Sequence, residues 1–230
     1  MNASPLKVLS SMATRELLSE LAILCERDLS QPVIAEAAGG VDIAKRVQAG
    51  EASDIVVLAA NVIDKLIGEG HLLAGSRVDL VKSGVGVAVR KGAAGYDISS
   101  ENAVKDAVLA ARSLSYSTGP SGIYLQQLFE RWGILQTVQS RIVVPPPGVP
   151  VGTLVARGDC ELGFQQMSEL INLSGIELLG PLPAAIQTLT IFSAGISSKS
   201  QSPDAARRVL EFMASPATVD LKRRFGMESA

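Results

Sequence analysis

Histidine and cysteine, the usual zinc ligands, are scarce in this sequence. It has one histidine, His71, and two cysteines, Cys25 and Cys160, among 230 residues. A structural zinc site takes about four ligands, largely histidine and cysteine, so we expect no metal site. A Ser–His–Asp triad would have to use His71, which follows the sequence GEG and is expected to be an exposed loop residue. We expect two thiols without a functional role, although two cysteines also leave a disulfide open.

Charged residues are also few, and long apolar runs are absent from the sequence. Charged residues make up 19% of the chain, the net charge is −2 and no basic tract occurs, so nucleic acid is not an expected partner. No stretch reaches about 18 uninterrupted apolar residues, so we expect no membrane-embedded segment. The start, MNASPLKVLSS, lacks the basic and apolar segments of an export signal. We therefore expect a cytoplasmic protein as the sequence stands, or a periplasmic one if an export signal has been removed.

Three common functional motifs are absent. No G-x-G-x-x-G follows a strand pattern, and no G-x-x-x-x-G-K-[ST] or G-x-S-x-G occurs. These are the signatures of dinucleotide sites, nucleoside triphosphate sites and hydrolase nucleophiles. We accordingly expect no cofactor.

The residues that are present alternate between strand and helix patterns. Asp54–Ala59 is a continuous apolar run typical of a buried parallel strand, and Lys7–Leu9, Val85–Val89 and Arg141–Val144 are further expected strands. After the expected strand Lys7–Leu9, apolar residues recur at helical spacing, at Leu17, Leu18, Leu21 and Leu24. The pattern predicts an α/β protein with mostly parallel sheets flanked by helices.

Ligands of open α/β sheets bind beyond the carboxyl ends of the strands, so the loops that follow the strands are the candidate sites. The first such loop contains Ser10, Ser11, Thr14 and Arg15 just before a helix. Free N–H groups at a helix start favour an anion, and an arginine can bind a carboxylate through two hydrogen bonds. Ordinary helix capping by serine or threonine and a solvated Arg15 are the alternatives.

The second loop places Gly39 and Gly40 before a helix that contains Asp42. Two glycines allow a ligand to approach the backbone closely. Asp42 has three alternative roles: a cap of the helix, a base, or a carboxylate that orients Arg15 or Arg46.

Two later loops are also rich in polar groups. Ser117, Ser121 and Gly122 lie in the sequence STGPSG at a helix start, which is the most specific of the anion signals. Gln165 and Gln166 end a predicted strand and offer amides that would orient a ligand without adding charge.

The order of several segments resembles the molybdate-binding, type 2 periplasmic solute-binding family. These segments are LKVLSSMATRELLSEL, QAGEASDIVVLAA, SGVGVAVRKG, SYSTGPSGIYLQQLFERWGI and VGTLVARGDCELGFQQMSEL, and together they cover nearly the whole chain. The resemblance implies two α/β lobes, joined by two crossing strands, that close over a ligand in the cleft between them. We expect residues 1–82 plus 190–230 to form one lobe and residues 83–189 the other.

The chain departs from that family where the ligand would bind. The resemblance implies that Ala13 stands at the family's first serine position, Gly39 and Gly40 at the serines of the second loop, and Gln166 at a tyrosine position. A tetrahedral oxyanion needs a tight ring of donors, and each lost donor costs roughly 1–3 kcal/mol. The departures therefore favour a larger anion, with an organic carboxylate as the expected ligand.

The resemblance leaves several functions open. The first is a solute-binding protein for a small organic anion, with a membrane permease as its partner if it serves as a transport receptor. The second is an isomerase, because some molybdate-like members are similar to aconitate isomerase, which shifts a double bond by 1,3-proton transfer. Asp42 or Glu36 would then be the base and Arg15 the carboxylate clamp. Molybdate or tungstate capture for an ABC transporter is the reading that the ligand positions favour least, and an anion-sensing regulator is also open.

Overall fold

The computed structural model describes residues 3–146 and 148–230, and the chain divides into two compact units. Unit 1 comprises Met1–Lys82 and Ile191–Ala230, and unit 2 comprises Ser83–Thr190. Two strands, β4 (Val78–Arg90) and β8 (Leu189–Ile196), carry the chain from one unit to the other. Both units combine a sheet with flanking helices, which confirms the predicted α/β class.

The sheet of unit 1 has the strand order β2-β1-β3-β8-β4. Its first three strands are β1 (Leu6–Ser11), β2 (Val33–Ala38) and β3 (Ile55–Ala59). β1 runs parallel to both β2 and β3, whereas β8 runs antiparallel to β3. The short strand β9 (Glu228–Ser229) pairs with the unit 1 part of β4. Parallel pairs thus occur where helices connect the strands, and the returning strand β8 adds an antiparallel one.

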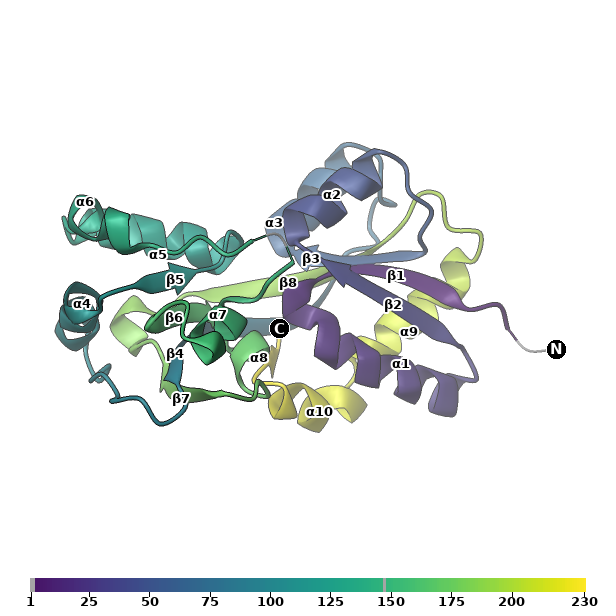
Figure 1. Cartoon of the computed structure of the whole chain (residues 1–230). Coiled ribbons are helices and arrows are strands. Elements are labelled where there is room, and N and C mark those ends of the chain that lie inside the picture. The colour runs from purple at the N-terminus through teal and green to yellow at the C-terminus, as the bar shows by residue number, and fades with distance from the viewer. Residues whose placement is uncertain (1–2, 147) are drawn as a thin grey trace. The chain divides into compact units, whose positions relative to one another are not determined.

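Helices cover both faces of this sheet (Figure 1). They are the 3-10 helix η1 (Met12–Thr14), α1 (Arg15–Leu29), α2 (Gly40–Gln48), α3 (Ala60–Gly68), α9 (Pro203–Ala214), η4 (Pro216–Thr218) and α10 (Val219–Arg224). On one face, Val8 of β1 packs in a core with Leu17 and Leu21 of α1. On the other, Leu9 packs with Ile43 of α2 and Ile63 of α3. Successive side chains of β1 therefore enter opposite cores, as the period of a strand requires.

Unit 2 has its own sheet, in which β4 runs antiparallel to both β6 and β7, and β5 runs parallel to β6, so this sheet is mixed rather than mostly parallel. Its further strands are β5 (Leu114–Tyr116), β6 (Leu162–Gln166) and β7 (Ile176–Pro181). Its helices are α4 (Glu101–Ala110), α5 (Pro120–Arg131), α6 (Leu135–Val138), η2 (Gln139–Arg141), α7 (Val151–Arg157), α8 (Met167–Leu170) and η3 (Ala184–Ile186). Phe129 and Phe164 meet edge to face in its core, with ring centroids 6.3 Å apart.

Two predicted strands differ from the structure. Arg141–Val144 forms no regular strand: Arg141 ends η2, and only Ile142 makes a single bridge, to Leu114. The prolines that follow Val144 lack the N–H groups that a longer ladder needs. β4 is much longer than the predicted Val85–Val89, because the polar residues before Val85 stay extended where the chain passes between the units.

The scarce residue types form no site within the described part of the chain. Cys25 and Cys160 are free and buried, and burial raises their pKa values to about 11 and about 12. Both thiols therefore stay protonated and unreactive near neutral pH. The described residues bring no three histidine, cysteine, aspartate or glutamate side chains together as a metal site. No helix among them is long and apolar enough to cross a membrane.

Candidate anion-binding site

Three helix starts gather at one edge of the unit 1 sheet. β1, β2 and β3 are parallel, and η1 with α1, α2 and α3 respectively follow them within two residues. The register pairs Ser11 with Ala38 of β2 and Ser10 with Val57 of β3, so the three strands end side by side. The carboxyl ends of parallel strands share one edge of a sheet, and the three loops are therefore neighbours.

None of these helix starts is capped by its own side chain. The residues at the cap positions are Ser11 for η1, Thr14 for α1, Gly39 for α2 and Ala59 for α3, and none accepts a capping hydrogen bond. In unit 2, by contrast, the Ser100 hydroxyl accepts from the Ala103 N–H at the start of α4. The first N–H groups of a helix have no partner within it and carry partial positive charge. This edge of unit 1 is suited to an anion.

The two predicted serines of the first loop are both buried, but they face opposite sides of the sheet. Ser10 lies on the same side of β1 as Val8, toward the core that α1 covers, and Ser11 lies on the side of Leu9, toward α2. Neither hydroxyl has a hydrogen-bond partner among the described residues. Because an unpaired buried hydroxyl is costly, each is a candidate ligand donor.

Gly40 brings the second loop against Ser11. A β-carbon added at Gly40 would lie 3.8 Å from the β-carbon of Ser11 and 3.7 Å from Leu58 Cδ2. The backbone of Gly40, the first residue of α2, therefore runs beside the Ser11 side chain. We call the group formed by Ser11, Gly39, Gly40 and Ala60 the serine–glycine edge. Ser11 and Gly40 lie at its centre.

Thr14 and Arg15 contribute less directly. Thr14 is buried, and its hydroxyl donates to the Ser11 carbonyl at 3.2 Å, which steadies the turn. Arg15 is exposed, and its Nη2 lies 2.6 Å from Oε1 of Glu16, the next residue. An exposed ion pair of this kind contributes little to stability, so a carboxylate ligand can compete for the Arg15 guanidinium.

Asp42 lies in the first turn of α2 and its carboxylate turns back over the helix start. A β-carbon added at Gly39 would lie 3.0 Å from Asp42 Oδ2. The carboxylate is therefore beside the serine–glycine edge, where the helix start favours its negative charge.

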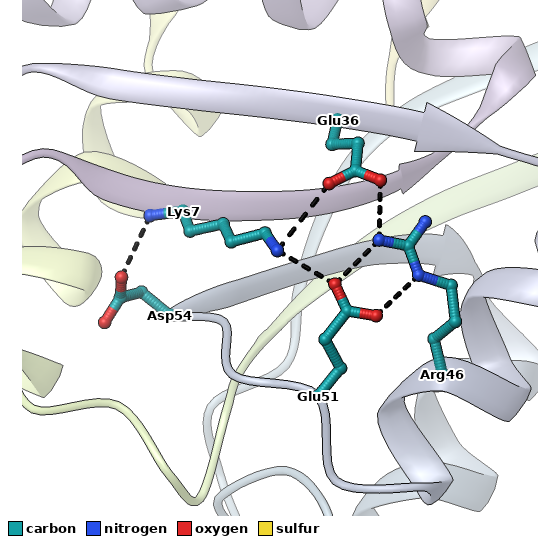
Figure 2. Close-up of polar contacts among 5 residues, drawn as sticks. All are labelled: Lys7, Glu36, Arg46, Glu51 and Asp54. Atoms are coloured by element: carbon teal, nitrogen blue, oxygen red, sulfur yellow. Dashed lines mark hydrogen bonds and ion pairs between the residues drawn. The ribbon is translucent and has the colours of Figure 1, made fainter.

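Glu36 is engaged in a network of four charged groups (Figure 2). Its Oε1 lies 2.6 Å from Arg46 Nη2, and its Oε2 lies 3.6 Å from Lys7 Nζ. Glu51 pairs with the same two cations, at 2.6 Å from Arg46 Nε and 2.8 Å from Lys7 Nζ. These hydrogen bonds, chiefly that from Arg46, lower the pKa of Glu51 to about 2. Among the described residues, Glu36 therefore has two cationic partners, whereas Asp42 forms no ion pair.

Unit 2 carries a pair of serine hydroxyls at the start of α5. Ser117 Oγ and Ser121 Oγ are 2.9 Å apart, and Ser117 Oγ also accepts from the Gly119 N–H at 3.3 Å. One hydrogen bond between two hydroxyls uses one of their two hydrogens, so a donor is left over. This close approach of Ser117 to the helix requires a glycine at position 122, because a β-carbon there would overlap the Ser117 carbonyl oxygen.

The two predicted glutamines are held by the protein itself. Gln165 Oε1 accepts from the Gly152 N–H at 3.0 Å, and its Nε2 donates to Glu169 Oε1 at 2.7 Å. The Gln166 amide lies 2.9 Å from Thr190 Oγ1. Both side chains are buried, and each already has a hydrogen-bond partner within the protein.

Residues at the start of α3 were missed by the sequence analysis. Ala60 and Asn61 follow β3 at the same edge as Ser11, and they begin a helix without a side-chain cap. The available signal was the strand DIVVLA running straight into a helical pattern. This position is suited to an anion because of its backbone N–H groups rather than its side chains, so the residue types do not predict it.

The chain is similar to bacterial solute-binding proteins and to an aconitate isomerase. The family model described as bacterial extracellular solute-binding protein matches residues 6–228. An aconitate isomerase from a Pseudomonas species is 40% identical over 174 residues, which are 75% of this chain and 66% of that protein. The matched segment thus spans slightly less than two thirds of that relative.

Two solved structures of similar fold are a molybdate-binding and a sulfate-binding protein. The periplasmic molybdate-binding protein of Azotobacter vinelandii has a TM-score of 0.81 at 20% identity, covering 96% of this chain and 98% of its own. The sulfate-binding protein SubI of Mycobacterium tuberculosis H37Rv has a TM-score of 0.78 at 13% identity, covering 98% and 86%. At such identities the likeness establishes the fold alone.

Proposed function

Since this chain belongs to the bacterial extracellular solute-binding protein family, we propose that it binds one small organic carboxylate at the serine–glycine edge of unit 1. The observation that carries the proposal is the Ser11 hydroxyl. It is buried, has no partner among the described residues, and lies beside Gly40 at three helix starts without side-chain caps. A carboxylate there would accept from the hydroxyl and from backbone N–H groups.

The side chains at this edge support a carboxylate rather than a compact oxyanion. Ala13, Gly39 and Gly40 bring no hydroxyl, so among the described residues of this edge Ser11 supplies the hydroxyl on the side of α2. A tetrahedral oxyanion needs donors for four oxygens, and each one left without a donor costs roughly 1–3 kcal/mol. A carboxylate has two oxygens, and Arg15 is exposed nearby in sequence for a second carboxylate.

A thermal-shift screen tests the ligand class. Purified protein is titrated with citrate, trans-aconitate, malate, molybdate and sulfate, since a bound ligand raises the melting temperature once its concentration exceeds Kd. We expect a di- or tricarboxylate to give the largest shift. Ser11→Ala should reduce that shift, and Ser19→Ala, an exposed serine of α1, is the matched control. A shift with molybdate or sulfate alone would show that the ligand class is wrong.

A second candidate, isomerisation of an unsaturated tricarboxylate, is favoured by the 40% identity to an aconitate isomerase. The reaction moves one proton: a base removes it from the carbon next to the double bond, the double bond shifts, and the proton is returned to the far carbon. We assign the base to Asp42, because its carboxylate lies beside the serine–glycine edge while Glu36 is held by Arg46 and Lys7.

Proton NMR of trans-aconitate with the purified protein tests this second candidate. Turnover would appear as growth of the cis isomer, and Asp42→Asn should abolish it while Glu36→Gln leaves most of it. No conversion by the wild-type protein, together with a thermal shift by carboxylates, would leave binding alone as the function.

A further inference from the structure

Two glutamine side chains hold β4 where unit 2 begins. Gln187 lies between η3 and β8, and its Oε1 accepts from the Val85 N–H at 2.8 Å and from the Thr188 N–H at 3.0 Å. Its Nε2 donates to the Val85 carbonyl at 3.0 Å. One amide thus satisfies both backbone polar groups of Val85, as a neighbouring strand would.

Gly84 allows this contact to be close. A β-carbon added at Gly84 would lie 3.0 Å from both Cδ and Nε2 of Gln187, which is tighter than ordinary packing allows. The glycine therefore lets the Gln187 amide lie flat against the backbone of β4.

Gln166 makes a second link, from β4 to β8. When its amide is oriented to satisfy both ends, Oε1 accepts from the Thr190 hydroxyl at 2.9 Å. Nε2 then lies within donating distance of the Ser83 carbonyl at 3.1 Å and the Gly84 carbonyl at 3.2 Å. The orientation of an amide is assigned from its partners, and this one leaves neither end unpaired.

These contacts fall at both points where the chain passes between the units. Ser83 is the first residue of unit 2, and Thr190 is its last. We propose that Gln166 and Gln187, which we call the glutamine clamp, hold the unit 2 ends of β4 and β8 as one rigid element. Bending between the units is then confined to the unit 1 side of Ser83 and Thr190, because backbone whose polar groups are engaged resists the changes in φ and ψ that a hinge needs. Gln166 is a positioning residue in this account, since its amide is fully used by the two strands.

Amide hydrogen exchange tests whether the clamp exists. Gln187→Met keeps a flexible side chain of similar length but removes the hydrogen bonds, so exchange at the Val85 amide should rise by about 10-fold. Gln126→Met on the exposed face of α5 is the control and should leave that amide unchanged. Unchanged exchange at Val85 in Gln187→Met would overturn the assignment.

Spin-label distance measurements test what the clamp does. Labels at Asp106→Cys in unit 2 and Arg207→Cys in unit 1 report the spread of distances between the units, and the buried native thiols should not react. We expect a broader distribution in the Gln166→Met/Gln187→Met protein than in the wild type or the Gln126→Met control. An unchanged distribution in a folded double variant would overturn the proposal, even if Val85 exchanges faster.

A milder variant covers the case in which the double variant does not fold. Gln187→Asn is one methylene shorter and withdraws the amide from Val85 while keeping its polarity. It should broaden the distance distribution to a lesser degree and speed exchange at Val85, and Gln126→Asn should do neither. Faster exchange without broadening in Gln187→Asn would also contradict the proposal.

Discussion

The carbonyl oxygen of Ser117 lies so close to Gly122 that a β-carbon at Gly122 would overlap it. Gly122→Ala must therefore move the start of α5, and we expect it to lower the free energy of unfolding by about 1–3 kcal/mol. Chemical denaturation measures this. Gly119→Ala is the matched control, because its β-carbon would lie 3.7 Å from Ser117 Oγ, an ordinary contact, and should change stability by less than about 0.5 kcal/mol. Equal losses in the two variants would contradict the explanation.

Gly40 gives a test of ligand binding that is separate from folding. A β-carbon there would make only ordinary contacts with Leu58 and Ser11, so Gly40→Ala should fold normally. The added methyl group would occupy space beside the Ser11 hydroxyl, and we expect carboxylate affinity to fall by about 10-fold. Isothermal titration calorimetry measures the affinity, and Gly68→Ala, with no atom within 4 Å, is the control. Unaltered affinity in Gly40→Ala would place the ligand elsewhere.

Glu51 should make stability depend on acidic pH. Its pKa is lowered from 4.5 to about 2 in the folded chain, first by Arg46 and then by Lys7. The charged carboxylate therefore stabilises the fold fully above about pH 4.5, and this stabilisation is lost as the pH falls toward 2. Glu51→Gln should flatten the dependence of the melting temperature on pH between these values. A variant with the same steep acid limb as the wild type would show that other groups dominate.

Lys222 is fully buried in α10, and its Nζ has no hydrogen-bond partner among the described residues. Burial lowers its pKa from 10.5, because the charged form loses its water. Replacement by a similar apolar side chain in Lys222→Met should stabilise the fold by about 1–3 kcal/mol at pH 7.

The pH dependence gives this effect a distinct sign. Between the folded pKa and 10.5 the unfolded chain binds more protons at Lys222, so wild-type stability rises with pH and the advantage of Lys222→Met shrinks. Lys45→Met on the exposed face of α2 should show neither effect. A destabilised Lys222→Met protein at pH 7 would mean that the amine has a favourable role in the fold.

The fold class could be predicted from sequence because its signals are local. The apolar run that becomes β3 and the helical spacing of Leu17 and Leu21 both report burial directly. The length of β4 could not be predicted, since Lys82, Ser83 and Gly84 interrupt its apolar pattern. That segment is extended because of tertiary contacts, including the Gln187 amide, which lies 102 residues from Val85 in sequence.

The candidate site was predicted only in part. The loops after β1 and β2 could be found because their strands end in hydroxyls and glycines. The sequence could not show that Ser10 and Ser11 face different cores, which depends on where the strand ends. Nor could it show that Glu36 is paired with Arg46, which lies on the next helix.

The central claim is that a carboxylate binds beside Ser11. Isothermal titration of the wild-type protein and of Ser11→Ala with trans-aconitate, citrate and molybdate tests it most directly. We predict that a carboxylate binds the wild type, that Ser11→Ala binds it about 10-fold more weakly at unchanged stoichiometry, and that molybdate gives no binding heat. Tight molybdate binding, or carboxylate affinity that is the same in Ser11→Ala, would contradict the account.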